Sequence, residues 1–440
     1  MVLHFDSEQL RIMNWRSSSG DIAAVVGPPG CGKTTVGSAL AVRMIAEGIA
    51  NRVLLVAYTN AAVNEFGREL CNILGPHTAQ RLCLRTGNPA GIDLSIPIHF
   101  SVQADDIRSR RIILCTTLSL KRLTSRMRFD NMIIDEAGIK KLQHLLLPFQ
   151  YGINQTVSHI YQSEIASTID NIIDLASYYG IVATVVGDPK QSKPVGLSYY
   201  DNSAIEWVIK KAHWDTLHIT HRLPDRLSGL VNEFASYGGL ISAQEVASRR
   251  LTLQHLPDIE YRNIIDPSEV ITWVNINKGN EEAIGPTSWA NETEARACAK
   301  ICHHLRRITR KKSIVIITRF TAQRMYIQDY LYRIGLDKDI KVSTTTGALG
   351  TQADITIFSL VRNNPERQVG AAGTLQDLNV SISRSKEKLI IIGNFDMMLY
   401  GWTSLPNQTK HGYKSAARSL ARLVDTKYGK VIDAPKILVR

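Results

Sequence analysis

The sequence predicts an α/β protein made of two consecutive domains, each built around a parallel sheet. Apolar runs of strand length alternate with helix-forming stretches, and this alternating series occurs twice along the chain. Strands that alternate with helices indicate a parallel sheet, because each crossover helix returns the chain to the same edge. A chain of 440 residues is also longer than a single hydrophobic core comfortably serves.

The predicted strands share a composition rich in Val, Ile and Leu. In the first half they are residues 22–26, 52–57, 111–115, 131–134 and 181–186. In the second half they are residues 270–274, 313–317, 355–360 and 388–392. We expect a first domain at residues 1–203, a second at 204–400 and a basic C-terminal tail at 401–440. The long stretch between the fourth and fifth strands predicts a helical insertion at about residues 140–179.

Composition favours a cytosolic protein with a polyanionic partner. The formal charge is +12, and basic proteins bind nucleic acids by releasing the counterions that phosphates hold. No apolar run approaches the roughly 18 residues of a membrane span, and the N-terminus lacks the pattern of a signal peptide. We therefore expect a cytoplasmic location without membrane contact, although a nuclear or viral-replication setting remains open.

The six cysteines are expected to be reduced and buried, because they are scattered through apolar runs. One group, Cys298, Cys302, His303 and His304, could in principle bind a metal ion. Its spacing is that of a helical i, i+4 pair and differs from the C-x-x-C knuckle of zinc sites. A buried helix face is therefore the favoured interpretation of this group.

The clearest chemical motif is a complete G-x-x-x-x-G-K-[ST] phosphate loop between a predicted strand and a predicted helix. The loop glycines let backbone N–H groups approach phosphates, Lys33 supplies a cation and Thr34 offers a hydroxyl to Mg²⁺. ATP is the expected ligand, with Mg²⁺ as its metal. The predicted ATP-binding residues of this motif are Gly27, Pro28, Gly30, Gly32, Lys33, Thr34 and Thr35.

Two further strand ends complete a predicted hydrolytic site. Asp135 and Glu136 follow a buried strand, so Asp135 would hold the metal while Glu136 orients or deprotonates the attacking water. A surface acidic turn is the alternative for this pair. Gln191, which follows another strand in the segment 186–191, is placed to sense the γ-phosphate.

Taken together, these motifs resemble those of superfamily 1 helicases, specifically the up-frameshift (nonsense-mediated-decay) subfamily. The resemblance extends from Phe5 to about Trp402 and includes Thr220-His221-Arg222-Leu223-Pro224 and the segment 378–386, which is similar to LNVALTRAK. It implies two tandem RecA-like domains that hydrolyse ATP in the cleft between them. It also implies that Gln9 reads adenine and that Gly350 and Gln352 contribute to the ATP site.

The resemblance also implies a nucleic-acid path and two transition-state cations. Its predicted nucleic-acid contacts are Thr59, Asn60, Thr116, Thr117, Thr318, Thr345 and Thr346. Arg222 and Arg384 would stabilise the charge that develops on the γ-phosphate, since guanidinium groups do this in phosphoryl transfer. Either arginine in isolation would pass for a surface ion-pair residue.

The chain departs from the family pattern where relatives have a QG-x-E element. Gly350 fits that element, but Leu349 stands in place of Gln and Gln352 in place of Glu. We therefore carry two hypotheses. The first is an ATP-dependent helicase or translocase on single-stranded RNA or DNA, moving 5′ to 3′ by kinship. The second is an ATP-regulated nucleic-acid clamp or switch that does not unwind. A phosphate-loop enzyme for a small molecule fits Arg222 and Arg384 poorly.

Overall fold

The computed structural model describes residues 4–18, 21–123, 127–139, 147–149, 151, 180–191, 203–309, 311–403 and 413–439. The chain forms two compact units, Met1–His218 and Ile219–Arg440. The first unit extends past the predicted boundary at residue 203, because α9 (Ala204–Lys211) packs against its sheet and β8 (His213–Thr216) pairs with one of its strands. The predicted helical insertion lies outside the described residues, apart from residues 147–149 and 151.

The described strands of the first unit form one parallel sheet with the order β4-β3-β5-β2-β6-β7-β1-β8. Its strands are β1 (Ile22–Val26), β2 (Val53–Ala57), β3 (Cys83–Arg85), β4 (His99–Phe100), β5 (Ile112–Thr116), β6 (Asn131–Ile134), β7 (Ala183–Gly187) and β8 (His213–Thr216). Its helices are α1 (Ser7–Ser18), α2 (Lys33–Ala46), α3 (Asn60–Leu74), α4 (Pro76–Leu82), α5 (Ala104–Ser109) and α9 (Ala204–Lys211).

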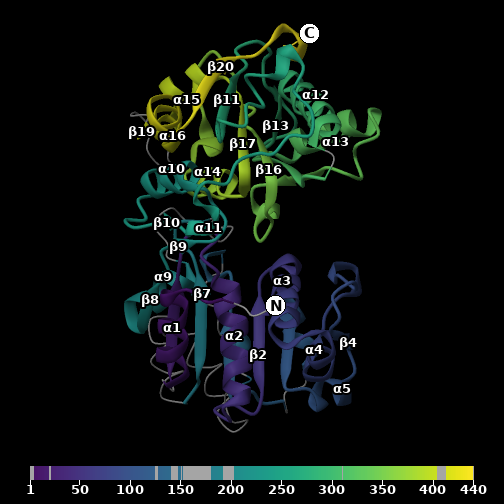
Figure 1. Ribbon diagram of the computed structural model, residues 1–440, viewed down its shortest axis with the longest axis vertical. Helices are drawn as coiled ribbons and strands as arrows, with labels where there is room; N and C mark the ends of the chain where they lie inside the picture. Colours follow the sequence, from purple (N-terminus) through teal and green to yellow (C-terminus); the bar gives the residue numbers. More distant parts are fainter. Residues whose placement is uncertain are drawn as a thin grey trace. The chain divides into compact units, whose positions relative to one another are not determined.

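Helices cover both faces of this sheet, which explains why its central strands are continuously apolar. Helices α1, α2 and α3 contact one another in that order and lie in front of the sheet in Figure 1. Helix α9 contributes Ala204, Ile205 and Val208 to a core cluster with Ile22 and Leu54. Because all the strands are parallel, their carboxyl ends meet at one edge, where a ligand can contact several loops at once.

The described strands of the second unit include a parallel sheet with the order β15-β14-β16-β17-β11-β20. Its strands are β11 (Ile271–Asn275), β14 (Ile314–Thr318), β15 (Lys341–Thr344), β16 (Ala353–Ser359), β17 (Ser385–Gly393) and β20 (Lys430–Asp433). Short pairs outside this sheet are β9 (Ile219–Thr220) with β10 (Ile241–Ser242), β12 (Glu282–Ala283) with β13 (Trp289–Ala290), and β18 (Trp402–Thr403) with β19 (Tyr413–Lys414).

The helices of the second unit are α10 (Asp225–Ala235), α11 (Gln244–Ala247), α12 (Glu292–Thr309), α13 (Thr321–Arg333), α14 (Leu375–Ile382), α15 (Phe395–Tyr400), α16 (Ala416–Leu423) and α17 (Lys436–Val439). Helices α12 and α13 pack together against the sheet, and α14 packs with α10 and α16. Both units thus have the predicted architecture, which confirms an α/β fold with two consecutive domains built on parallel sheets.

Residues 413–439 are part of the second unit, so the predicted basic tail at 401–440 is wrong for this stretch. Strand β20 pairs with β11 at the edge of the sheet, and α17 packs on α12. Leu420 and Leu438 are fully buried. Apolar residues spaced between the basic ones drive this docking, because lysine and arginine keep their charges at the surface.

All six cysteines are free thiols, and all except the half-buried Cys71 are buried as expected. Cys298 and Cys302 lie on the face of α12 that packs into the apolar core, where burial raises the pKa of both thiols, that of Cys302 to about 12. His304 instead stacks on Tyr261 and accepts a hydrogen bond from the amide of Asp258.

The described part of the chain holds no cluster of three or more metal-ligating side chains, and none of its helices has both the length and the apolarity to cross a bilayer.

A buried polar network lies at the carboxyl end of β16. The Glu294 carboxylate accepts hydrogen bonds from Ser359 Oγ at 2.8 Å and from the Val361 amide at 2.9 Å. Gln323 bridges Ser359 and the backbone of Asn291. Burial raises the pKa of Glu294 to about 7, because the charged form is desolvated. The network ties α12 and α13 to the sheet.

We expect stability to fall between pH 5 and 7 because of Glu294. Its pKa in the folded protein is above its ordinary value of 4.5, so the folded state binds more protons in this window. The stabilisation is present below the ordinary pKa and is lost as pH rises through about 7, at a cost of up to about 3 kcal/mol. Thermal melts should show that Glu294→Gln flattens this dependence. The exposed Glu292→Gln on the same helix is the control; equal slopes in wild type and Glu294→Gln would contradict the assignment.

Candidate nucleotide and nucleic-acid sites

The phosphate loop connects β1 to α2 as the motif predicts. Gly30 and Gly32 have φ angles of 80° and 74°, a conformation that glycine adopts without strain. The Lys33 ammonium donates hydrogen bonds to the carbonyl oxygens of Gly27 at 2.6 Å and Pro28 at 2.9 Å. The lysine therefore lies over the loop whose backbone N–H groups would donate hydrogen bonds to phosphates.

Thr34 and Asp135 meet beside this loop. The Thr34 hydroxyl donates to Asp135 Oδ2 at 3.0 Å, although the two residues are far apart in sequence. Asp135 follows β6, and its amide continues the sheet by donating to Val56. Mg²⁺ prefers oxygen ligands about 2.1 Å away in octahedral geometry, in which neighbouring ligands lie about 3 Å apart. Both the chemistry and the spacing of these two oxygens fit Mg²⁺.

Glu136 has an unusual backbone and a specific partner. Its φ angle is 56°, which is uncommon for a residue with a side chain and often marks a functional site. Its carboxylate oxygen Oε2 accepts hydrogen bonds from both the amide and the hydroxyl of Thr59, each at 3.1 Å. The carboxylate is thereby directed toward the end of β2, one strand away from β6.

Gln191 is held by Asp188, a residue that the sequence motif contains but to which no role was assigned. Gln191 Nε2 donates to Asp188 Oδ2 at 2.8 Å, and the Lys190 amide donates to Oδ1 at 2.9 Å. The buried Asp188 also lies against Gly138, where an added Cβ would come within 2.5 Å of the Asp188 carbonyl oxygen. The segments after β6 and β7 therefore fit together only with glycine at position 138.

Gln9 lies against the phosphate loop. Its amide nitrogen is 3.4 Å from the Cys31 carbonyl oxygen and would be within 2.4 Å of a Cβ at Gly32. Helix α1, which carries Gln9, is anchored by the fully buried Arg16, whose Nε donates to Thr184 Oγ1 at 2.7 Å. Burial lowers the pKa of Arg16 to about 10. Thr35, at the start of α2, forms a hydrogen bond with Glu69, whose pKa is raised by burial.

The predicted nucleic-acid residues of the first unit lie at the carboxyl ends of β2 and β5. The Asn60 side-chain oxygen accepts from the buried Arg85 guanidinium at 2.7 Å, a contact that the sequence did not suggest. Thr116 and Thr117 are buried, and their hydroxyls bond to Ser119 at 2.8 Å and to the Ala57 carbonyl at 3.4 Å. Their side chains therefore brace the edge, whereas Thr59 and Asn60 are partly exposed on it.

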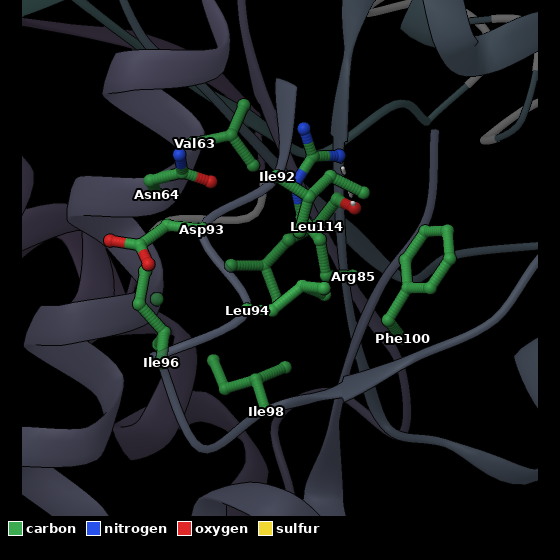
Figure 2. A pocket seen from close by; sticks show the side chains of 11 residues that line it. Val63, Asn64, Arg85, Ile92, Asp93, Leu94, Ile96, Ile98, Phe100 and Leu114 are labelled. Atoms are coloured by element: carbon green, nitrogen blue, oxygen red, sulfur yellow. Dashed lines mark hydrogen bonds between the residues drawn. The ribbon is translucent and has the colours of Figure 1, made fainter. Parts of the chain in front are cut away.

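A small pocket lies beneath this edge, between α3 and the segment before β4 (Figure 2). Its walls are mainly apolar, and its volume is about 20 Å³. That volume holds about one water molecule and is far too small for a nucleobase. The pocket lining, seen as sticks in Figure 2, is Val63, Asn64, Gly67, Arg85, Ile92, Asp93, Leu94, Ile96, Ile98, Phe100 and Leu114.

In the second unit, Arg222 and Gln352 are in contact. Arg222 Nε donates to Gln352 Oε1 at 3.1 Å, and its NH1 donates to the Ser383 carbonyl at 3.3 Å. Arg384 is buried, and its Nε donates to the Val380 carbonyl at 2.9 Å. Gly350 adopts a φ angle of 72° just before Gln352. The structure thus brings the sequence-predicted Arg222 and Gln352 together and attaches Arg222 to the residue before Arg384.

One predicted nucleic-acid residue of the second unit, Thr345, contacts Asp377, which sequence reasoning missed. Thr345 is buried and donates to Asp377 Oδ1 at 3.3 Å, while the Arg319 guanidinium lies 2.8 Å from Oδ2. Thr318 is also buried, and its carbonyl accepts from the Thr345 amide. Thr346 is exposed. Thr318 is the last residue of β14, and Thr345 and Thr346 follow β15, so the three threonines share the carboxyl edge of the sheet.

Comparison with known proteins gives one family match in the first unit and one that falls mostly in the second. Two family models, each described as an AAA domain, match residues 4–107 and 200–396. The chain is 24% identical over 430 residues to a regulator of nonsense transcripts 1 homolog of Neurospora crassa, covering 86% of this chain and 36% of that protein. It is 25% identical over 426 residues to the ATP-dependent helicase NAM7 of Saccharomyces cerevisiae, covering 85% and 40%.

A third relative is the DNA replication ATP-dependent helicase/nuclease dna2 of Schizosaccharomyces pombe. It is 23% identical over 429 residues, covering 89% of this chain and 28% of that protein. The chain thus spans between about a quarter and two fifths of the length of these relatives. The motif order, the two parallel-sheet units and these matches support the resemblance of this chain to up-frameshift-like superfamily 1 helicases.

Proposed function

We propose that this protein is an ATP-dependent translocase or helicase that acts on single-stranded nucleic acid. The observation that carries the proposal is the meeting of the Thr34 hydroxyl and the Asp135 carboxylate, 3.0 Å apart, beside the Lys33 phosphate loop. This arrangement suits a nucleoside triphosphate with its metal. The AAA-domain matches and the helicase relatives support the same conclusion.

In this proposal the first unit binds and activates the nucleotide. Lys33 neutralises the β- and γ-phosphates, and Gln9 contacts the base. Thr34 and Asp135 would hold Mg²⁺, which neutralises phosphate charge when it is bound. Glu136 accepts a proton from the attacking water, since a carboxylate acts as a general base when it lies within hydrogen-bond reach. Gln191, oriented by Asp188, reports on the γ-phosphate.

The second unit supplies positive charge in this proposal. Arg222 and Arg384 stabilise the oxygens of the transferring phosphoryl group, where charge develops as the bond breaks. The contact between Arg222 and Gln352 holds this guanidinium through a neutral amide. A carboxylate at position 352 would instead form an ion pair with it, so the present side chain restrains Arg222 more weakly.

The nucleic-acid path follows the carboxyl edges of the two sheets. Of the residues predicted to line it, Thr59, Asn60 and Thr346 are exposed or partly exposed, and their polar side chains suit contacts with phosphates and sugars. The overall charge of +12 also favours a polyanion. The small pocket beneath the first edge has no room for a base. We therefore infer a grip on the backbone with weak preference for sequence.

A clamp that binds nucleic acid under the control of ATP is the second candidate. It is favoured by the Gln352 contact, because relatives are expected to carry an acid at this position. A clamp and a helicase share the ATP site and the backbone grip, so they differ in whether duplex strands are separated.

We expect single-stranded RNA or DNA to increase ATP hydrolysis severalfold and Lys33→Ala to abolish it. Binding should weaken steeply with salt, by roughly 0.7 in the logarithmic slope for each phosphate neutralised. ATPase assays with single-stranded RNA, single-stranded DNA and no nucleic acid, together with salt titrations, measure both effects. Strand displacement in the same samples supports the helicase, and its absence supports the clamp. No hydrolysis by the wild type would refute the proposal.

Arg222→Ala should lower kcat by roughly 100-fold with a smaller change in ATP affinity, because its contact strengthens as charge develops. Arg222 is a cleaner target than Arg384, which is buried and bonded to the backbone. Arg226→Ala is the matched control, since Arg226 is exposed and pairs with Glu269 at 3.1 Å. Steady-state kinetics decide the matter. If kcat falls equally in the two variants, or if Arg222→Ala lowers only the melting temperature, Arg222 has a structural role and does not act in hydrolysis.

A further inference from the structure

Thr59 connects two sites that the motifs treat separately. By resemblance it is a nucleic-acid contact, yet its amide and its hydroxyl both donate to Glu136 Oε2 at 3.1 Å. It lies where β2 leads into α3, and β2 is the direct neighbour of β6, which leads to Glu136. One residue therefore touches the carboxylate proposed to activate water and also faces the proposed strand path.

The hydroxyl of Thr59 has a limited capacity for hydrogen bonds. It accepts from the Ala62 amide at 3.2 Å, which caps the N-terminus of α3, and it donates its single hydrogen to Glu136. A phosphate oxygen at Thr59 would need that same hydrogen. The hydroxyl can serve the carboxylate or the phosphate, but not both at once.

The two donors on Glu136 Oε2 also occupy the lone pairs with which this oxygen would accept a proton from water. Glu136 is held in this position although its backbone has a φ angle of 56°, which side-chain-bearing residues disfavour. Loss of the hydroxyl contact would let the carboxylate turn away from Thr59. The contact thus favours a less active arrangement of the water-activating group.

We infer that Thr59 is a positioning residue that restrains Glu136 while no strand is bound and releases it when a nucleic-acid phosphate takes the hydroxyl hydrogen. This inference rests on the proposed function and adds its regulation. It makes nucleic acid a stimulator of hydrolysis through one side chain in the first unit. It also predicts that removal of the hydroxyl mimics the bound strand.

The test compares Thr59→Val, which removes the hydroxyl but keeps the branched shape, with Thr59→Ser, which keeps it. In Thr59→Val, hydrolysis without nucleic acid should rise by about tenfold or more, as expected for loss of one hydrogen bond to a charged group. Hydrolysis with saturating single-stranded RNA should not rise, so the ratio of stimulated to basal rates falls. Thr59→Ser should restore the wild-type ratio. In a Glu136→Gln background, Thr59→Val should give no increase.

Two controls separate coupling from a structural effect. Asn394→Ala removes an equivalent helix cap from α15, where the Asn394 side chain accepts from the Met397 amide, and should leave the ratio unchanged. Melting curves report the loss of the cap itself. If Thr59→Val lowers both rates equally, or keeps the wild-type ratio, the inference is wrong while the proposed function stands. If the wild type neither hydrolyses ATP nor responds to nucleic acid, both are wrong.

Discussion

The hydrogen bond between the Thr34 hydroxyl and the Asp135 carboxylate is the contact around which the proposed nucleotide site is built. It exists because β1 and β6 belong to one parallel sheet, in which β7 lies between them. Parallel order sends the chain into loops at the same edge after each strand, so distant residues of the sequence become neighbours. The phosphate loop, the acidic pair and the segment with Gln191 all depend on this edge.

The same edge explains why polar groups are buried in an otherwise apolar architecture. Asp188, Arg85 and Glu294 are all largely inaccessible, and each is hydrogen-bonded to the loops that follow strands. Burial of such groups costs free energy unless they find partners, but satisfied networks fix the loops in one conformation. In both units, burying these polar groups lowers stability but fixes the loops at the carboxyl edge in one conformation. Glu136, whose φ angle is positive, is a further residue at this edge in an unfavourable conformation.

The sequence predicted the central strands and the phosphate-site motifs because both have strong local signals. Strands buried on both faces are continuous apolar runs, and β1 and β6 begin and end where predicted. Edge strands such as β8, with the sequence His-Trp-Asp-Thr, and β20 lack that signal, so the domain boundary and the C-terminal region were misjudged. The pairings of Thr59 with Glu136 and of Asn60 with Arg85 have no local pattern, because they follow from strand order in three dimensions.

The most direct test of the central claim is a double-mutant cycle on ATP affinity with Thr34→Val and Asp135→Asn. Binding of a fluorescent ATP analogue is measured for the wild type, both single variants and the double variant, in Mg²⁺ and in EDTA. If the two oxygens share one metal ion, each single change should weaken binding in Mg²⁺ on the order of tenfold or more. The double variant should then lose little beyond the larger single loss, and the differences should shrink in EDTA. Additive losses that are the same in Mg²⁺ and EDTA would contradict the account.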